Sequence, residues 1–321
     1  MKYKSLSDYL KETFGTKVYK ISLQSGCSCP NRDGSIGYGG CSFCSEGGSG
    51  DFAAPLLPID EQISLAKARV DQKFSSKIAP EDRRYIAYFQ SYTNTYGDPE
   101  KLYQLYHQTL QHPEIVGLSI GTRPDCLPPD ILDMLSRLER GTVLCPGPYP
   151  QSVGRGTVPR PNSKPIWVEL GLQTIHEKTA AAIHRGYSLD VFTKAYHELR
   201  ARGITVIVHV ILGLPGESRE DILETIRFLS SLTPTLEGIK LQLLHVLKGT
   251  ALAAEYEANP FRIFTLEEYC DLVVDCLKLL PEETVVHRIT GDGPKNLLIA
   301  PKWSGNKKVV LNTLQKAIRE A

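Results

Sequence analysis

The sequence predicts an α/β fold, a partial (β/α)6 TIM-like barrel with a smaller C-terminal α/β extension. Short apolar runs alternate with stretches of helical periodicity along the chain, which is typical of βα units and a parallel sheet. Six such units follow one another, enough to curl a sheet but fewer than the eight of a closed barrel. Polar motifs follow the predicted strands at their C-terminal ends, where folds of this kind carry their chemistry.

The predicted strands are apolar or alternate apolar and polar residues, and the predicted helices have apolar residues at helical spacing. The run ITVIVHVIL at 204–212 is apolar almost throughout, as expected of a parallel strand buried on both faces. The six predicted strands span residues 17–23, 84–90, 115–120, 166–172, 204–212 and 238–246. The helices between them span residues 60–74, 99–111, 129–140, 176–184, 189–202 and 218–231.

Two further regions shape the predicted domain organisation. Residues 141–165 contain six prolines and no periodicity, so we expect a long surface loop inserted in the barrel. Residues 1–248 then form the barrel core, and residues 249–321 form the C-terminal extension. The extension is predicted to hold a helix at 265–280, a short strand near 284–289 and a final helix.

The composition is that of an ordinary globular protein, with 41% hydrophobic and 23% charged residues in a chain of 321. The formal net charge of +1 provides no overall field for nucleic acid, although it leaves room for a local basic patch. No run approaches the roughly 20 apolar residues of a membrane span, and the N-terminus lacks the apolar core of a signal peptide. We therefore expect a cytoplasmic protein with reduced thiols, in which clustered cysteines favour metal or redox chemistry over disulfides.

The segment 25–46 carries four of the eight cysteines, which are Cys27, Cys29, Cys41 and Cys44. A proline and several glycines lie between them, so the segment is predicted to be a loop that folds back and brings the thiols together. Cys41 and Cys44 have two residues between them, a spacing with which one tight turn presents both sulfurs to one metal centre. The spacing leaves two alternatives: a zinc site closed by all four cysteines, or a four-iron cluster held by three of them, with one iron open.

Seven motifs lie in order along nearly the whole chain: GCSCPNRDGSIGYGGCSFC, YFQSYTNTY, SIGTRPDC, WVELGLQT, HVILGLPGE, LHVLKGT and HRITGDGP. Together they resemble the YtqA/YhcC-like family of radical S-adenosylmethionine (SAM) enzymes, which is related to the catalytic subunit of Elongator. The resemblance implies a [4Fe-4S] cluster with Cys29, Cys41 and Cys44 as ligands and SAM on the open iron. Eleven residues and then two separate these ligands, whereas three and then two are commonest in the superfamily. Cys27 lies where an aromatic residue is expected, which makes it an alternative ligand.

The resemblance also implies how the cofactor is used and held. An electron passed through the cluster cleaves SAM to a 5′-deoxyadenosyl radical, which removes a hydrogen atom from the substrate. Phe43 is expected beside the adenine, and Gln90 and Ser91 at the methionyl amino group. His209 stands where related proteins direct an aspartate at the ribose, and Gly213 lets the backbone approach the adenine. The implied cofactor-binding residues are Phe43, Gln90, Ser91, Gln173, Arg185, His209 and Gly213.

For the substrate, the resemblance implies modification of the C5 side chain of the tRNA wobble uridine, in the pathway to 5-methylaminomethyl-2-thiouridine. The expected partners are tRNA and an electron donor such as flavodoxin or ferredoxin. In the C-terminal extension, Lys302, Trp303, Lys307 and Lys308 are expected to hold phosphates and stack a base. Further arginines that would add to a local basic patch are Arg83, Arg84, Arg155 and Arg160.

Two other functions stay open at this point. One is a radical SAM enzyme that acts on a small metabolite, a porphyrin or a peptide; the other is a non-catalytic zinc, haem or cluster protein.

Arg123 and Lys248 are candidates to bind the SAM carboxylate, a substrate phosphate or a neighbouring acid. Gln173 and Arg185 have a second interpretation, in which they satisfy backbone groups at a strand end. Glu169 lies in an otherwise apolar strand, and we expect its side chain to face the barrel interior.

Overall fold

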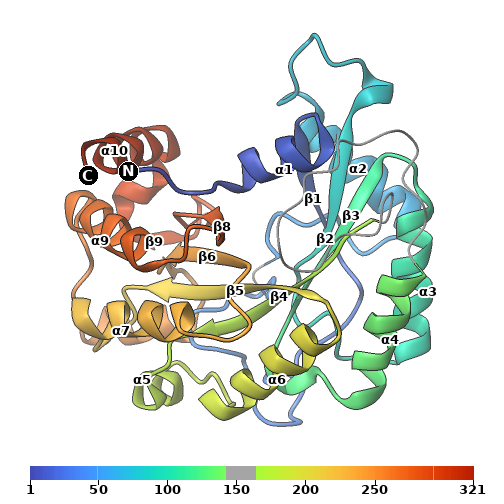
Figure 1. Cartoon of the computed structure of the whole chain (residues 1–321). Helices are drawn as coiled ribbons and strands as arrows, with labels where there is room; N and C mark the ends of the chain where they lie inside the picture. Colours follow the sequence, from blue (N-terminus) through green and yellow to red (C-terminus); the bar gives the residue numbers. More distant parts are fainter. Residues whose placement is uncertain (49, 142–163, 292) are drawn as a thin grey trace.

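The computed structural model describes residues 1–48, 50–141, 164–291 and 293–321, and it shows one curled parallel sheet with helices outside it (Figure 1). The sheet has seven strands in the order β1-β2-β3-β4-β5-β6-β8. These strands are β1 (Val18–Leu23), β2 (Arg84–Phe89), β3 (Ile115–Thr122), β4 (Ile166–Gln173), β5 (Thr205–Leu212), β6 (Gly238–Leu243) and β8 (Val285–Arg288). The partial barrel of βα units predicted from the sequence is therefore confirmed.

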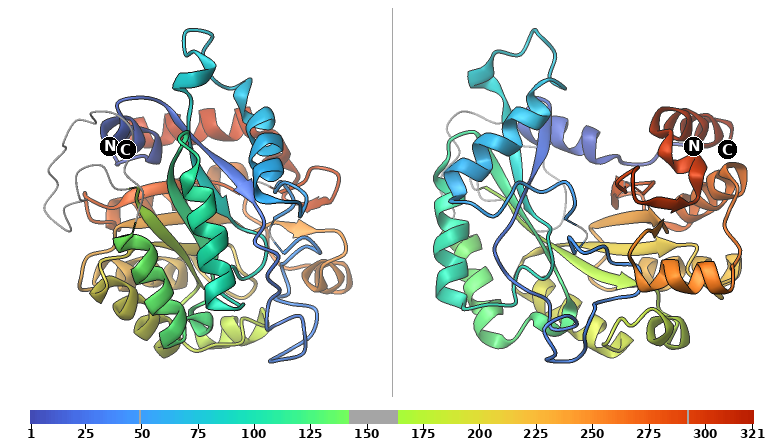
Figure 2. Two further views of the ribbon diagram at one scale, coloured as in Figure 1. Left: turned by 90° about the vertical axis from the view of Figure 1, so that its right-hand side faces the viewer. Right: turned by 180° about the vertical axis from the view of Figure 1, so that it is seen from behind.

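Helices pack on the convex face of the sheet, as the views in Figure 2 show. Their buried apolar residues and the outward-pointing residues of the strands form the main core. The helices are α1 (Leu6–Phe14), α2 (Ile59–Asp71), α3 (Pro99–Gln111), α4 (Pro129–Arg140), α5 (Glu177–Ala182), α6 (Leu189–Ala201), α7 (Arg219–Ser230), α8 (Ala251–Ala258), α9 (Leu266–Leu279) and α10 (Lys307–Glu320). Most of the predicted bounds are within a few residues of these, because one face of each helix meets this core and imposes the apolar spacing.

Three differences from the prediction concern the ends of the barrel. The segment 238–246 is not one strand, because β6 ends at Leu243 and β7 (Val246–Leu247) pairs antiparallel with β9 (Leu298–Ala300). Strand β8, which comes from the predicted extension, pairs parallel with β6 and adds a seventh strand. Helices α1 and α8 are additional elements; Ser5 caps the N-terminus of α1, a short-range signal that sequence analysis passed over. The division into 1–248 and 249–321 stays a prediction.

Helix α1 closes the N-terminal end of the barrel interior. Leu10 and Phe14 of α1 pack in one cluster with Ile86, Trp167 and Ile207 from the strands. These three strand residues each lie two positions before a polar residue of the interior, so they point to the same concave face of the sheet. Because an apolar plug fills the N-terminal end, ligands are expected at the C-terminal ends of the strands.

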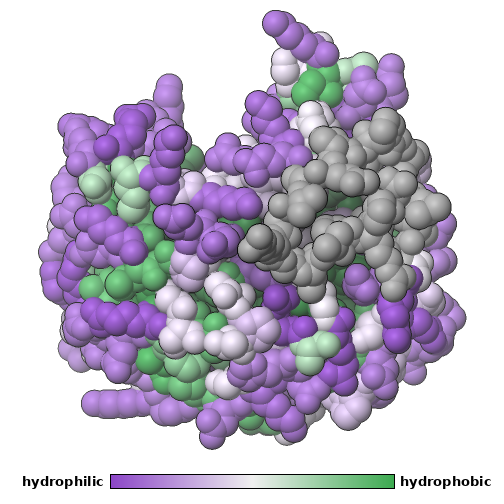
Figure 3. Space-filling view, viewed as in Figure 1, coloured by the Kyte–Doolittle hydropathy of each residue, from purple (hydrophilic) through white to green (hydrophobic). Residues whose placement is uncertain are grey.

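The two ends of the chain lie side by side, and the amino group of Met1 donates a hydrogen bond to the carbonyl oxygen of Ile318 at 3.0 Å (Figure 1). Figure 3 shows one face of the molecule, on which hydrophilic side chains prevail and apolar residues form patches between them. Among the described helices, none is long and apolar enough to cross a bilayer. Of the predicted insert 141–165, residues 142–163 lie outside the described part of the chain, and with them Cys145, Arg155 and Arg160.

Candidate active site

The loops that follow β1, β2 and β3 meet at the C-terminal edge of the sheet. The backbone N–H of Thr93 donates to the carbonyl oxygen of Ser28 at 3.2 Å, which ties the loop after β2 to the cysteine loop. Asn94 donates from its side-chain amide to the carbonyl oxygen of Gly121 at 2.9 Å, and its Oδ1 accepts a hydrogen bond from Ser25 Oγ at 2.7 Å. Motifs far apart in the sequence are therefore brought together, because parallel strands end at the same edge.

Cys41 and Cys44 lie on one tight turn of the cysteine loop, in which the N–H of Cys44 donates to the carbonyl oxygen of Cys41 at 2.9 Å. Hydrogen bonding to Cys44 and burial raise the pKa of the Cys41 thiol well above its ordinary value, while Arg123 and Asn31 oppose this shift. The Asn31 side chain lies 3.6 Å from Cys41 Sγ and also donates to the carbonyl oxygen of His184 at 2.5 Å. The two half-buried thiols thus face each other near a cationic group.

Arg123 is paired with a neighbouring acid, which is one of the three partners that the sequence left open. Its Nε and Nη2 donate to the two carboxylate oxygens of Asp125 at 2.9 and 2.7 Å. The same guanidinium lies over the ring of Tyr187, with 4.9 Å from its central carbon to the ring centroid. Arg123 is therefore a fixed cation beside the cysteine turn, held in place from two sides.

Cys29 and Cys27, two residues apart, have different surroundings. Burial raises the pKa of the Cys126 thiol to about 12, and Asp125 and Cys29 add to the shift, so the Cys29 thiol lies near the loop that carries Arg123. The Cys27 thiol packs against the main core instead, where a Cβ on Gly97 would lie 3.3 Å from its sulfur. Cys27 thus lies toward the N-terminal end of α3 and not beside the Cys41–Cys44 turn.

Ser91 has a buried hydroxyl that accepts and donates no hydrogen bond within the described ranges. The end of the cysteine loop lies directly on it and on its neighbour, since a Cβ on Gly50 would overlap Ser91 Oγ and one on Gly48 would overlap the Tyr92 ring. Gly48 also has a φ of +58°, so a side chain is excluded there for two reasons. A buried polar atom without a partner is costly in a folded protein, and it indicates a place where a ligand completes the hydrogen bonds.

Gln173 ends β4 in a strained conformation. Its φ is +65°, which is rare for a residue with a side chain, and the strand register shifts between Gly171 and Gln173. The Oε1 atom of Gln173 accepts a hydrogen bond from the hydroxyl of Tyr187 at 2.9 Å. Gln173 thus joins the end of β4 to the ring beneath Arg123, and its predicted contact with SAM stays a prediction.

Arg185 is almost fully buried, and its donors are taken up by backbone carbonyl oxygens and by the carboxylate of Glu177. Its guanidinium donates to the carbonyl oxygens of Leu172 at 3.1 Å, Thr174 at 2.6 Å and Tyr187 at 2.9 Å. The alternative interpretation of this residue, satisfaction of backbone groups at a strand end, is therefore what these contacts show. A role in SAM binding stays a prediction.

A cavity of about 130 Å³ lies between the cysteine loop, the ends of β5 and β6, and the segment after β8. Phe43 and Phe52 line it on the cysteine-loop side, and Ile211 and Gln242 line it from the strands. Gly213, one of the predicted residues, has a φ of +95°, and a Cβ there would lie 3.2 Å from the ring of Phe264. Phe43 thus lies at a cavity wall, and its predicted contact with the adenine of SAM stays a prediction.

The barrel interior below this cavity holds a charged network around Glu169, which faces the interior as expected. Its Oε1 accepts hydrogen bonds from Lys20 Nζ at 2.5 Å and Ser119 Oγ at 2.6 Å. Its Oε2 is bonded to His209 Nε2 at 2.7 Å and to Lys240 Nζ, and Lys240 also donates to the hydroxyl of Tyr88 at 3.1 Å. One carboxylate thus joins residues of six strands, β1 to β6, across the concave face.

Charges in this network shift one another. Burial opposes ionisation of Glu169, but Lys20, Lys240 and His209 outweigh it and hold the pKa of the carboxyl well below its usual range. Burial lowers the pKa of Lys240 to about 7, with Glu169 opposing and Lys20 and Arg288 adding to the decrease. The pKa of His209 falls to about 4, again chiefly through burial. The interior therefore contains more cationic than anionic groups, and His209 is neutral at neutral pH.

His209 has both ring nitrogens in contact with protein groups. Nε2 donates to Glu169, and Nδ1 faces the side-chain nitrogen of Gln242 at 3.5 Å. Both nitrogens thus have protein neighbours, and the predicted ribose contact stays a prediction. Lys20 and Lys240 are sequence signals from which the charged network around Glu169 could have been predicted. A lysine inside a buried strand requires a partner across the interior.

Trp303 of the C-terminal segment is half-buried. The indole Nε1–H donates to the carbonyl oxygen of Phe264 at 2.9 Å, and the ring packs at a centroid distance of 5.7 Å from Tyr269 of α9. The indole is thus held by the packing around α9, and its predicted role in stacking a base stays a prediction.

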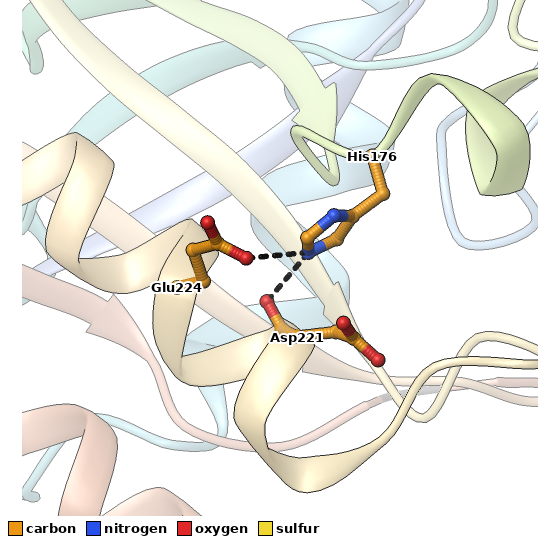
Figure 4. A group of neighbouring side chains, drawn as sticks. All are labelled: His176, Asp221 and Glu224. Atoms are coloured by element: carbon orange, nitrogen blue, oxygen red, sulfur yellow. Dashed lines mark hydrogen bonds and ion pairs between the residues drawn. The ribbon is translucent and has the colours of Figure 1, made fainter.

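Away from the cysteine loop, His176, Asp221 and Glu224 form a group whose ligand atoms lie within 4.8 Å of one another (Figure 4). The Nε2–H of His176 donates to the backbone carbonyl oxygen of Asp221 at 2.8 Å, so this nitrogen has no lone pair for an ion. The Asp221 carboxylate points away from the imidazole and caps Ser218 at the start of α7. This group therefore stabilises the contact between the start of α5 and α7 and does not form a metal site.

Comparison with known proteins agrees with these features. Residues 161–229 match the radical SAM superfamily, and residues 236–320 match the radical SAM C-terminal domain. The chain is 41% identical to the protein YtqA of Bacillus subtilis over 318 residues, which are 99% of this chain and 89% of YtqA. It is 34% identical to the protein YhcC of Escherichia coli K12 over 311 residues, 97% of this chain and 90% of YhcC.

Among solved structures, the archaeal Elp3 of Methanocaldococcus infernus superposes with a TM-score of 0.62 at 15% sequence identity. The match covers 93% of this chain and 63% of the Elp3 chain, and it shows a shared fold. The fold, the cysteine loop at the C-terminal edge of the sheet and the similarity over almost the full length agree with one another. The chain therefore belongs to the radical SAM superfamily, in the family that contains YtqA and YhcC.

Proposed function

We propose that this radical SAM enzyme modifies the C5 side chain of the wobble uridine of tRNA, in the pathway to 5-methylaminomethyl-2-thiouridine. The observation that carries the reaction type is the cysteine loop beside a cavity at the C-terminal edge of a half barrel. The substrate is the one that the motif resemblance implies, and the fold shared with Elp3 supports it. We further propose tRNA and a flavodoxin or ferredoxin as the partners.

The residues present fit a [4Fe-4S] cluster and SAM better than a closed zinc site. Zinc would require a fourth ligand, and the Cys27 thiol packs toward α3 instead. Cys29, Cys41 and Cys44 would hold the cluster, and the buried Ser91 hydroxyl would complete its hydrogen bonds with a polar group of SAM. When bound, these two groups supply a 5′-deoxyadenosyl radical that removes a hydrogen atom from the substrate.

The chain's own side chains prepare this site in two ways. Asn31 and Arg32 fix the cysteine loop, since the Arg32 guanidinium donates to the carbonyl oxygens of Cys44 and Ser45 at 3.3 and 2.6 Å. Phe43 and Ile211 line the cavity with apolar surface. Exclusion of water by such walls protects a reactive intermediate from side reactions.

The test is anaerobic reconstitution of the purified protein followed by an assay with bulk tRNA from a strain that lacks the gene. We expect SAM cleavage to 5′-deoxyadenosine together with a change in the wobble-uridine nucleosides, measured by chromatography and mass spectrometry. A Cys41→Ala variant is the control and should produce neither. If tRNA from the deletion strain has the same wobble-uridine profile as tRNA from the parent strain, the substrate proposal is wrong.

A further inference from the structure

Arg288 occupies a special position at the end of β8, the last strand of the sheet. It lines the cavity, as Phe43 of the cysteine loop does, and it pairs in register with Lys240 of β6. Arg288 is half-buried, and among the described residues its guanidinium has no hydrogen-bond acceptor and no carboxylate partner. Guanidinium groups in protein interiors are normally paired, because burial of a charge without a partner is costly.

Among the described residues, the carboxylates near Arg288 are already used. Both oxygens of Glu169 are occupied, Oε1 by Lys20 and Ser119 and Oε2 by His209 and Lys240. Asp51, the carboxylate among the described residues that line the cavity, accepts hydrogen bonds from Ser45 Oγ at 3.0 and 2.8 Å. The interior thus has an excess of positive charge at the end of the cavity that Arg288 occupies.

We propose that Arg288, with the side-chain amide of Gln242, forms a subsite that binds a carboxylate on the C5 side chain of the substrate uridine. This inference rests on the proposed function and specifies its substrate. A planar guanidinium binds a carboxylate through two parallel hydrogen bonds, which fixes direction as well as position. With the carboxylate held at Arg288, the carbon atoms of the side chain extend across the cavity toward Phe43 and the cysteine loop.

The experiment compares two anticodon stem-loop RNAs that differ in one group, 5-carboxymethyluridine or the uncharged 5-carbamoylmethyluridine at the wobble position. Binding is measured anaerobically by fluorescence anisotropy with cluster-loaded protein and SAM, without reductant. The wild type is expected to bind the carboxylate RNA about 10- to 100-fold more tightly, as for a charge-assisted pair. Arg288→Gln should bind both RNAs as the wild type binds the carbamoyl RNA.

Two further variants make the comparison specific. Arg288→Lys keeps the positive charge but lacks the two parallel N–H donors of a guanidinium, so it should retain part of the preference for the carboxylate RNA. Arg227→Gln removes an exposed arginine of α7, which pairs with Glu220 on the outer surface, and should behave as the wild type. Iron content and circular dichroism show whether each variant is folded and loaded, and Arg288→Lys carries the test if Arg288→Gln does not fold.

Three results would overturn the proposal. The first is equal binding of the two RNAs by the wild type, and the second is a preference that Arg288→Gln retains. The third is an equal loss of affinity for both RNAs in Arg288→Gln, which would assign Arg288 to a backbone phosphate.

If neither RNA binds the wild type, the proposed function fails, and thermal unfolding in acetate or acetamide at matched ionic strength then decides about the subsite. Acetate should raise the unfolding midpoint of the wild type but not of Arg288→Gln. The same midpoint in both solutes would refute an anion subsite altogether.

Discussion

The most direct test of the interior network is the substitution Glu169→Gln. Glutamine has nearly the same shape as glutamate and keeps one acceptor oxygen, so the change removes a charge without opening a cavity. It leaves Lys20 and Lys240, whose side chains are 16% and 5% exposed, without the carboxylate that both contact. The effect on stability therefore reports the interaction between this carboxylate and its cationic partners.

The expected magnitude follows from the burial of these groups. Removal of one partner of a buried ion pair leaves an uncompensated charge and costs about 3–5 kcal/mol. Here two ammonium groups lose their partner, but Ser119, His209 and Tyr88 stay in place as hydrogen-bonding groups. We therefore expect the free energy of unfolding to fall by about 3–5 kcal/mol near pH 7.

The penalty should depend on pH, and the sign follows from Lys240. Its pKa in the folded protein is about 7, below its ordinary value of 10.5, so between these values the unfolded chain binds more protons. Stability then rises with pH across this window, because the folded state no longer has to bury a charged ammonium. In Glu169→Gln the pKa of Lys240 falls further, since Glu169 raises it. The two proteins therefore differ in the protonation of folded Lys240 only near and below pH 7, so the loss of stability should grow as the pH falls from 8 to 6.

The assay is urea unfolding of the anaerobic protein, followed by circular dichroism at pH 6 and pH 8. Glu220→Gln is the matched control, because Glu220 is exposed and pairs with an exposed arginine, so its loss should cost less than about 1 kcal/mol. Equal stability of Glu169→Gln and the wild type, or a loss that is the same at both pH values, would refute this account of the interior.

Three other predictions test separate parts of the structure. Alanine in place of any of the three predicted cluster ligands should abolish the absorbance near 400 nm and the bound iron after reconstitution, whereas Cys27→Ala should retain both, because its thiol packs toward α3. Gly213→Ala should lower stability by about 1–3 kcal/mol and weaken SAM binding measured by calorimetry; Gly203→Ala, at a similar φ but with open space around its Cβ, should cost less. Phe14→Ala should lower the free energy of unfolding by about 3–5 kcal/mol in a urea titration, because it empties the plug at the barrel's N-terminal end, and an unchanged midpoint would contradict the role of α1.

The sequence by itself determined the fold class and the kind of site. Apolar periodicity is imposed locally by burial of one face of each helix and of both faces of each strand, so it is readable without the tertiary structure. The cysteine loop could also be predicted from local sequence, because Cys41 and Cys44 are close in sequence and glycines mark the turns between the predicted ligands.

The tertiary structure decided which distant residues meet. The sequence placed Cys27 and Cys29 two positions apart, but only the packing against α3 separated their thiols. The seventh strand and Arg288 lie in a segment that looked like an extension, and only its pairing with β6 brings the guanidinium to the cavity. Glu169 and Lys240 are 71 residues apart, and their contact depends on the curl and register of the sheet. Such contacts depend on closure of the barrel interior, which joins residues across strands and has no periodic signal along the chain.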